Sequence, residues 1–182
     1  MGSRAPGTLL AALLAFALLA ALASALLIPT STVRGARAQA PRGQDATYIT
    51  GCTNITKPGY YVISSNINGA QAAGYCIGIF ASDVVIYGDG HWLTGAGNRG
   101  GVGIYVALGS INVTIEDVGI SNYNTGIVVN SSGVRVVNST AIYNDGYGIN
   151  VTGSGDSIVN SNASYDGYGI NVTGSGDSII NS

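Results

Sequence analysis

Residues 145–158 read DGYGINVTGSGDSI, and residues 166–179 repeat these fourteen letters without a change, at an offset of 21. Weaker copies of the central Gly-Ile-x-Val pattern begin upstream at Gly103 and Gly126. A second short apolar element follows each copy, as at residues 113–115. A repeat of this length has to be interpreted before local structure is assigned, because it specifies a repeat architecture.

The apolar elements of the repeat are too short for helices, and they alternate with a period of two between turn residues. A unit of 21 to 23 residues cannot enclose its own core, but it fits one coil of a parallel β-helix, in which each coil is buried by its neighbours. The sequence therefore predicts an all-β fold, a right-handed parallel β-helix of about five coils. Three inward ladders are expected: Ile104, Ile127, Ile149 and Ile170; Ile115, Val136, Ile158 and Ile179; Ala141 and Ala163.

One polar position recurs between the second and third ladders. It is occupied by Asp117, Asn138, Asn160 and Asn181. Asn and Asp are common at tight corners, and stacked side-chain amides can hydrogen-bond from coil to coil. We expect these residues to form a corner ladder.

The C-terminal end of the sequence offers no capping segment, because Ser182 corresponds to Ser161 partway round a coil. An uncapped coil presents unpaired strands. Two interpretations stay open: end-to-end self-association through this coil, or truncation of a longer repeat protein.

The first forty residues are not expected to belong to the fold. Residues 9–28 are apolar except for Ser24 and follow Arg4, which predicts a hydrophobic helix acting as a secretory signal or membrane anchor. Small-residue sites for cleavage end at Ala25 and Ala40, whereas the arginines beyond the apolar stretch would resist crossing the membrane and leave an uncleaved anchor as the alternative. The expected segments are 1–40, the signal or anchor with a linker; 41–75, an N-terminal cap with entry strands; and 76–182, the β-helix repeats.

Charge and cysteine content bear on location and partners. Residues 41–182 hold four cationic side chains against nine carboxylates, a net charge of −5, so nucleic acid is not an expected partner.

Cys52 and Cys76 are expected to form a disulfide in an exported protein; two separate buried thiols are the alternative. The protein is predicted to be extracytoplasmic, secreted or on the cell surface, and in contact with a membrane only through its N-terminal segment.

Two long segments carry a family resemblance. CTNITKPGYYVISSNING (52–69) and YCIGIFASDVVIYGDGHWLTGAG (75–97), followed by NVTIEDVGISNYNTGIVV (112–129), resemble the NosD-like, carbohydrate-binding and sugar-hydrolase (CASH) group of right-handed β-helix proteins, especially its archaeal cell-surface members. The resemblance covers nearly all of residues 50–182. It implies the fold and an extracytoplasmic location. It does not define an activity, because this fold carries lyases, hydrolases, epimerases, adhesins and metallochaperones.

Copper handling, which the NosD resemblance suggests, is not expected of this chain. Copper sites need imidazole, thiolate or thioether ligands. The sequence contains one histidine, His91, and no methionine after Met1. We expect His91 to order a turn, and we predict no metal and no cofactor.

A complete polysaccharide-cleaving site is not expected either. Lyases combine bound calcium with a basic residue, and hydrolases use paired carboxylates. Stacking would bring Asp145 near Asp166 and Asp156 near Asp177, which makes these four weak calcium candidates. The alternative is that all four are ordinary turn residues. Arg135 is expected to project outward between Thr114 and Ser157, away from any acidic neighbour on its strand face.

The residues of this chain fit sugar binding better than copper handling or polysaccharide cleavage. The aromatic side chains Trp92, Tyr105, Tyr147 and Tyr168 can offer exposed faces for sugar stacking, although tyrosines beside glycine can also fill corners between coils. Possible N-glycosylation sites, each an Asn-x-Ser/Thr triplet, are Asn54, Asn112, Asn130, Asn150, Asn162 and Asn171. Asn150 and Asn171 should face outward, whereas Asn138 belongs to the corner ladder and should stay unmodified.

The sequence as a whole predicts an exported β-helix repeat protein that binds surface carbohydrate or serves as a structural module of the cell envelope. Its partners would be surface polysaccharide or other envelope proteins. The alternative is the N-terminal part of a polysaccharide lyase or glycoside hydrolase whose catalytic coils lie beyond Ser182.

Overall fold

A computed structural model describes residues 45–69, 74–97 and 100–182. The expected signal or anchor segment, residues 1–40, lies outside the described residues. Within the described part of the chain, no helix is long and apolar enough to cross a membrane.

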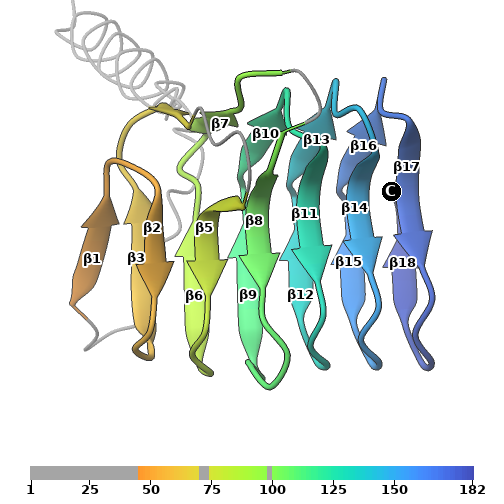
Figure 1. Cartoon of the computed structure of the whole chain (residues 1–182). Helices are drawn as coiled ribbons and strands as arrows, with labels where there is room; N and C mark the ends of the chain where they lie inside the picture. Colours follow the sequence, from red (N-terminus) through yellow and green to blue (C-terminus); the bar gives the residue numbers. More distant parts are fainter. Residues whose placement is uncertain (1–44, 70–73, 98–99) are drawn as a thin grey trace, which may run out of the picture. The chain divides into compact units, whose positions relative to one another are not determined.

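The described strands form three parallel sheets whose members stack in chain order (Figure 1). The seven-stranded sheet contains β1 (Ala46–Ile49), β3 (Gly59–Ile63), β6 (Val84–Tyr87), β9 (Val113–Glu116), β12 (Arg135–Val137), β15 (Ser157–Val159) and β18 (Ser178–Ile180). The five-stranded sheet contains β4 (Ile67–Asn68), β7 (Trp92–Thr94), β10 (Gly119–Ser121), β13 (Thr140–Ile142) and β16 (Asn162–Ser164). The six-stranded sheet contains β2 (Thr53–Ile55), β5 (Tyr75–Ile79), β8 (Val102–Val106), β11 (Thr125–Val129), β14 (Tyr147–Val151) and β17 (Tyr168–Val172).

A complete coil takes one strand from each sheet, so each strand from β2 to β15 pairs with the strand three places further along the chain, whereas β1 pairs with β3. This arrangement is a parallel β-solenoid of about six turns, which confirms the predicted all-β solenoid. The expected number of about five is too low. The additional turn comes from β2, which lies in the segment assigned to the cap but pairs with β5 in register, Thr53 against Ile77. The expected right hand of the coil stays a prediction.

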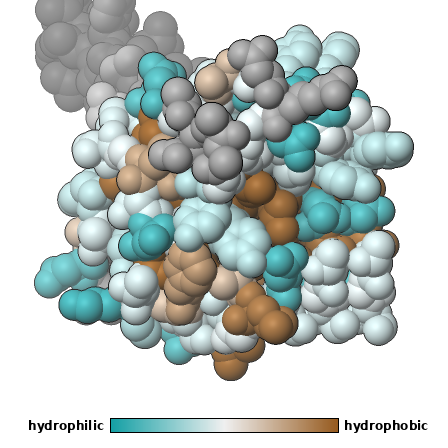
Figure 2. Space-filling model, viewed as in Figure 1, coloured by the Kyte–Doolittle hydropathy of each residue, from teal (hydrophilic) through white to brown (hydrophobic). Residues whose placement is uncertain are grey.

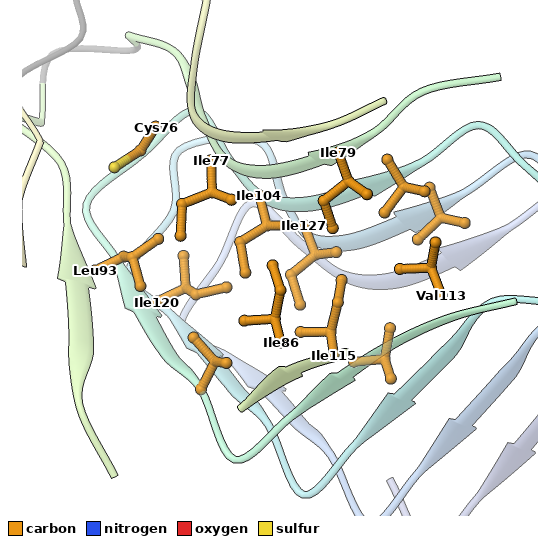
Figure 3. Close-up of a cluster of buried hydrophobic side chains, with 14 of the residues drawn as sticks. Cys76, Ile77, Ile79, Ile86, Leu93, Ile104, Val113, Ile115, Ile120 and Ile127 are labelled. Carbon is orange, nitrogen blue, oxygen red and sulfur yellow. The ribbon is translucent and has the colours of Figure 1, made fainter. Parts of the chain in front are cut away.

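The core includes most members of the predicted ladders, whereas Ile179 on the last strand is 50% exposed. Ile104, Ile127, Ile149 and Ile170 are successive partners in the six-stranded sheet, and the second and third ladders are paired as expected in the other two. Figure 3 shows Ile77, Ile104 and Ile127 in one row that faces Ile86 and Ile115 across the interior. Full burial of such a side chain contributes about 1.5–3 kcal/mol.

The predicted corner ladder adopts a left-handed backbone. Asp117, Asn138, Asn160 and Asn181 have φ values of 56°, 50°, 50° and 52°. Asn and Asp tolerate this conformation better than other residues with a Cβ, which explains why the position is restricted to them. Asn181 Nδ2 donates to Asn160 Oδ1 at 3.3 Å, so amide bonding from coil to coil is present at the last two positions.

A disulfide joins Cys52 to Cys76, as predicted. It connects the turn before β2 to the second residue of β5, and Cys76 is almost completely buried. Gly69 packs against both sulfur atoms, since a Cβ at this residue would lie 2.5 Å from Cys52 Sγ and 2.8 Å from Cys76 Sγ. Disulfides persist mainly outside the reducing cytosol, so the bond agrees with the expected location.

Candidate functional site

The four aromatic residues predicted to bind sugar lie on two different sheets. Trp92 begins β7 of the five-stranded sheet, whereas Tyr105, Tyr147 and Tyr168 lie on β8, β14 and β17 of the six-stranded sheet. Tyr147 and Tyr168 are paired in register and stack with ring centroids 5.1 Å apart. Trp92 therefore has to be considered separately from the three tyrosines.

Tyr105 belongs to an aromatic cluster that the sequence did not reveal. Its ring stacks on Tyr75 at 5.3 Å with an interplanar angle of 13°, and Phe80 lies at 6.3 Å with its ring tilted. The rings cover Gly78, where an added Cβ would lie within 3.0 Å of both Tyr75 and Phe80. Asn130 Nδ2 donates to the Tyr105 hydroxyl at 3.2 Å. These rings pack against one another and so form a structural cluster, in which Phe80 stays 43% exposed.

Trp92 is arranged differently, with its indole flat against the sheet. Gly119 is its partner on the next coil, and a Cβ added to Gly119 would lie within 3.0 Å of Cδ2, Cε2 and Cε3 of the indole. The last two atoms are both bonded to Cδ2, so a point almost equally close to all three must lie above the ring face. One face of the indole therefore covers the Gly119 backbone, and the opposite face is turned away from the sheet.

The position of Trp92 is fixed by hydrogen bonds to the preceding coil. The Trp92 backbone N–H donates to Asn66 Oδ1 at 3.0 Å, and His91 Nδ1 lies 3.3 Å from the same oxygen. The His91 N–H donates to Gly88 O at 2.9 Å, while its carbonyl accepts the Gly119 N–H at 3.1 Å. His91 therefore orders the turn in front of Trp92, as the sequence predicted.

A hollow of about 110 Å³ lies beside the indole. It brings together the indole, a carboxylate, a side-chain amide and a hydroxyl, and its lining residues are Gly90, Trp92, Asp117, Val118, Gly119, Asn138 and Thr140. Asp117 and Asn138 are adjacent members of the corner ladder. An aromatic face bordered by hydrogen-bonding groups of these types can hold the apolar face and the hydroxyl groups of one sugar ring.

A larger hollow of about 360 Å³ lies at the first turn, where residues 47–53 and Tyr61 line it. Tyr48 is its most exposed ring, at 67%. Its walls consist of threonine hydroxyls, backbone and tyrosine, and they contain no carboxylate among the described lining residues. It also borders the start of β1, next to residues that the structure does not describe. The smaller hollow therefore offers the better defined chemistry.

Of the weak calcium candidates, Asp156 and Asp177 do lie on successive coils. Asp156 Oδ1 accepts the Val134 N–H at 2.7 Å, and Asp177 Oδ1 accepts the Asp156 N–H at 2.8 Å. Both Oδ2 atoms are buried without a hydrogen-bond partner. Burial raises the pKa of Asp156 and the nearby Asp177 carboxylate raises it further, while backbone hydrogen bonds from Val134 and Gly133 oppose the shift.

The second expected carboxylate pair is out of register. Asp166 Oδ1 accepts hydrogen bonds from the Asn144 backbone N–H at 2.7 Å and from Asn144 Nδ2 at 2.9 Å, so Asn144 rather than Asp145 is its partner on the preceding coil. The corner before β17 is one residue shorter than the corner before β14, so the offset between paired residues is 22 up to Asp166 and 21 from Tyr168 onward. Burial raises the pKa of Asp166. A calcium role for the four aspartates stays a prediction.

Asn150 and Asn171 are partly exposed on the outer face of β14 and β17, as expected, and Asn171 Nδ2 donates to Asn150 Oδ1 at 2.8 Å. Asn54, Asn112 and Asn162 are more exposed. Arg135 is exposed and pairs with Thr114 and Ser157, as the sequence predicted. Glycan attachment at the six predicted sites stays a prediction.

The described residues contain no cluster typical of a metal centre. Among residues 45–69, 74–97 and 100–182, no three His, Cys, Asp or Glu side chains gather closely enough to hold a metal ion. On the face shown in Figure 2, hydrophobic residues form separate patches bordered by hydrophilic ones.

Comparisons with protein-family models, curated proteins and solved structures find no match to the chain. The parallel β-solenoid is consistent with a β-helix repeat family, and the specific resemblance to the NosD-like group stays a prediction.

Proposed function

We propose that this chain is an extracytoplasmic carbohydrate-binding module whose contact with sugar is centred on Trp92. The observation that carries the proposal is the flat indole over Gly119, beside the hollow lined by Asp117, Asn138 and Thr140. An aromatic ring that lies parallel to the surface presents one face to a pyranose, whose C–H groups stack on it. The carboxylate, amide and hydroxyl then supply partners for the sugar hydroxyls.

Binding fits this hollow better than cleavage does. Asp117 is the one carboxylate among the described residues that line it. Glycoside hydrolysis ordinarily uses two carboxylates on opposite sides of the scissile bond. A role as the N-terminal part of a larger polysaccharide-acting enzyme remains the alternative, and it would leave the Trp92 hollow as a substrate-holding site of that enzyme.

The test uses Trp92 as its own probe, because it is the only tryptophan in the sequence. Neutral polysaccharides such as β-glucan, mannan and xylan are titrated into the purified protein while tryptophan fluorescence is recorded. We expect a saturable change in emission with at least one of them. Isothermal titration of the same ligand should show that Trp92→Ala weakens binding by at least about 10-fold, as loss of a stacked aromatic contact implies.

Two further variants test whether binding depends on the orientation of the indole as well as on its presence. Gly119→Ala keeps the tryptophan but places a methyl group against its inner face, so the ring has to tilt and the affinity should fall almost as far as in Trp92→Ala. Tyr48→Ala removes an exposed aromatic ring from the larger hollow and should leave binding unchanged. Full affinity in Trp92→Ala, or loss of affinity only in Tyr48→Ala, would contradict the proposal.

A further inference from the structure

The outer face of the five-stranded sheet presents a regular row of side chains beyond Trp92. In register, Trp92 is followed by Gly119 on β10, Thr140 on β13 and Asn162 on β16. Each coil thus contributes one residue to a row that runs parallel to the solenoid axis. After the glycine that accommodates the indole, the row continues with a hydroxyl and then an amide.

The corner ladder forms a second row beside the first. Its members Asn138 and Asn160 each precede, by two residues, the row member on the same coil, Thr140 or Asn162. Asn138, Asn160 and Asn162 are all exposed. Asn160 Oδ1 accepts from Asn181, and Asn162 Nδ2 donates to Ser164, so each side chain is held in place while it keeps further hydrogen-bonding capacity for a ligand.

The spacing of these rows suits a linear glycan. Parallel strands on successive coils are about 4.8 Å apart. An extended pyranose chain advances by a similar distance with each sugar. A chain that starts on the Trp92 indole and follows the solenoid axis therefore meets a new pair of polar side chains at each coil. A chain lying across the coils would leave this sheet at once, because the strands of the sheet contain at most three residues.

The charge of the two rows indicates an uncharged ligand. Asp117 is the only ionisable residue among the described members of both rows. The lysine and arginine side chains of the described residues lie elsewhere: Lys57 between β2 and β3, and Arg135 on the seven-stranded sheet. A uronate or sulfated chain would meet a carboxylate here without a lysine or arginine to compensate for it.

From these observations we infer that the ligand is a neutral, linear polysaccharide that lies parallel to the solenoid axis on the outer face of the five-stranded sheet, with one sugar on each coil. The inference rests on the proposed carbohydrate-binding function and specifies its substrate class and direction. The first sugar lies over the coil of Gly119, between Asp117 and the Trp92 indole that covers this glycine. Thr140 with Asn138 holds the second sugar, and Asn162 with Asn160 the third.

The experiment measures affinity against chain length, with unglycosylated recombinant protein so that no attached glycan covers Asn162. Gluco-, manno- and xylo-oligosaccharides from the disaccharide to the hexasaccharide are titrated by calorimetry and by Trp92 fluorescence. We expect the association constant to rise about 5-fold with the third sugar, as one or two added hydrogen bonds imply, and to change little after the fourth. Polygalacturonate should not bind more tightly than the neutral chains.

Asn162→Ala tests the direction of the chain. It should weaken binding of the tetrasaccharide about 5-fold and leave the disaccharide unchanged, because its contact is with the third sugar. Asn138→Ala should weaken both. The control is Asn54→Ala, which removes an exposed asparagine from the outer face of the six-stranded sheet and should change neither.

The outcomes separate this inference from the proposed function. Failure of every neutral glycan to alter Trp92 emission would contradict carbohydrate binding itself. Binding that requires Trp92 but does not strengthen beyond the disaccharide, or an Asn162→Ala effect that is equal at all lengths, would overturn the axial, one-sugar-per-coil arrangement alone. Tighter binding of polygalacturonate than of the neutral chains would overturn the assignment to a neutral ligand.

Discussion

Replacement of Asp156 by Asn tests whether this buried carboxyl group is neutral in the folded protein. Asp156 Oδ1 accepts the Val134 N–H, while Oδ2 is buried without a partner. A Cβ added to Gly153 would lie within 3.0 Å of both Oδ2 and the backbone oxygen of Ser131, so these two oxygen atoms face the same small space. Two acceptors in that arrangement repel each other unless Oδ2 carries a proton, or unless an amide nitrogen replaces it.

The sign of the pH dependence follows from the raised pKa of Asp156. The folded state binds this proton at a higher pH than the unfolded chain does. The resulting stability is therefore complete below the ordinary aspartate pKa of 3.8 and is lost as the pH rises through the folded-state pKa. In Asp156→Asn, the amide can donate to Ser131 at every pH. We expect the variant to be about 1 kcal/mol more stable than the wild type at pH 7, which corresponds to roughly 3 °C in Tm.

The assay is thermal and urea unfolding followed by circular dichroism across the acidic to neutral range, for the wild type, Asp156→Asn and the control Asp45→Asn. Asp45 is exposed ahead of β1, so its replacement by Asn should change the stability little. The stability gain of Asp156→Asn should disappear below about pH 4. A variant that is less stable than the wild type at pH 7, together with a rise in wild-type Tm on addition of calcium, would show that the carboxylate is charged and binds a cation, which would refute this reasoning.

Two further predictions concern the core and the disulfide. Ile127 is completely buried at the centre of its ladder, so Ile127→Ala should lower the free energy of unfolding by about 3–4 kcal/mol in urea titrations. The control Val128→Ala, at the partly exposed neighbouring position, should lower it by less than about 1 kcal/mol. Equal losses in the two variants would contradict the assignment of Ile127 to the inward face. The double replacement of Cys52 and Cys76 by Ala should cost about 3 kcal/mol, because the bond closes a loop across 24 residues. The same urea titration measures this loss, and unchanged stability together with two reactive thiols in the wild type would show that the bond does not form.

The ladders could be predicted because the repeat itself sets their register. When identical segments follow one another at 21 residues, parallel stacking places like residues together, and period-two alternation then decides which of them face inward. The corner ladder could be predicted for a related reason, since Asn and Asp are the residues that best tolerate a left-handed backbone at a fixed position in each coil.

A constant repeat offset does not predict which residues pair where a coil changes length. The Asp145 and Asp166 pair was expected from identical neighbouring letters, but the single extra residue before β14 moved Asn144 into the position below Asp166. The extra turn at β2 was missed for a similar reason, because the entry coil does not share the repeat pattern.

The candidate site was predicted only in part. Trp92 was identified as a sugar-binding candidate, but no pattern in the sequence indicated that its ring would lie over a glycine of the next coil. That contact joins residues 27 positions apart through the irregular first turns, where the offset differs from that of the later repeats. Tyr75 and Phe80 were missed because their packing depends on the bare backbone at Gly78.

The near-identity of the last two coils has a genetic consequence. Recombination between the gene segments that encode two such similar coils can add or remove a whole number of units. Each added unit places its isoleucines in the existing rows, so no new kind of interface between coils is required. Descendants of such a gene would differ in length by whole turns while their cross-section stayed the same. If each turn contacts one sugar, the gene would lengthen the recognised glycan segment by the same events.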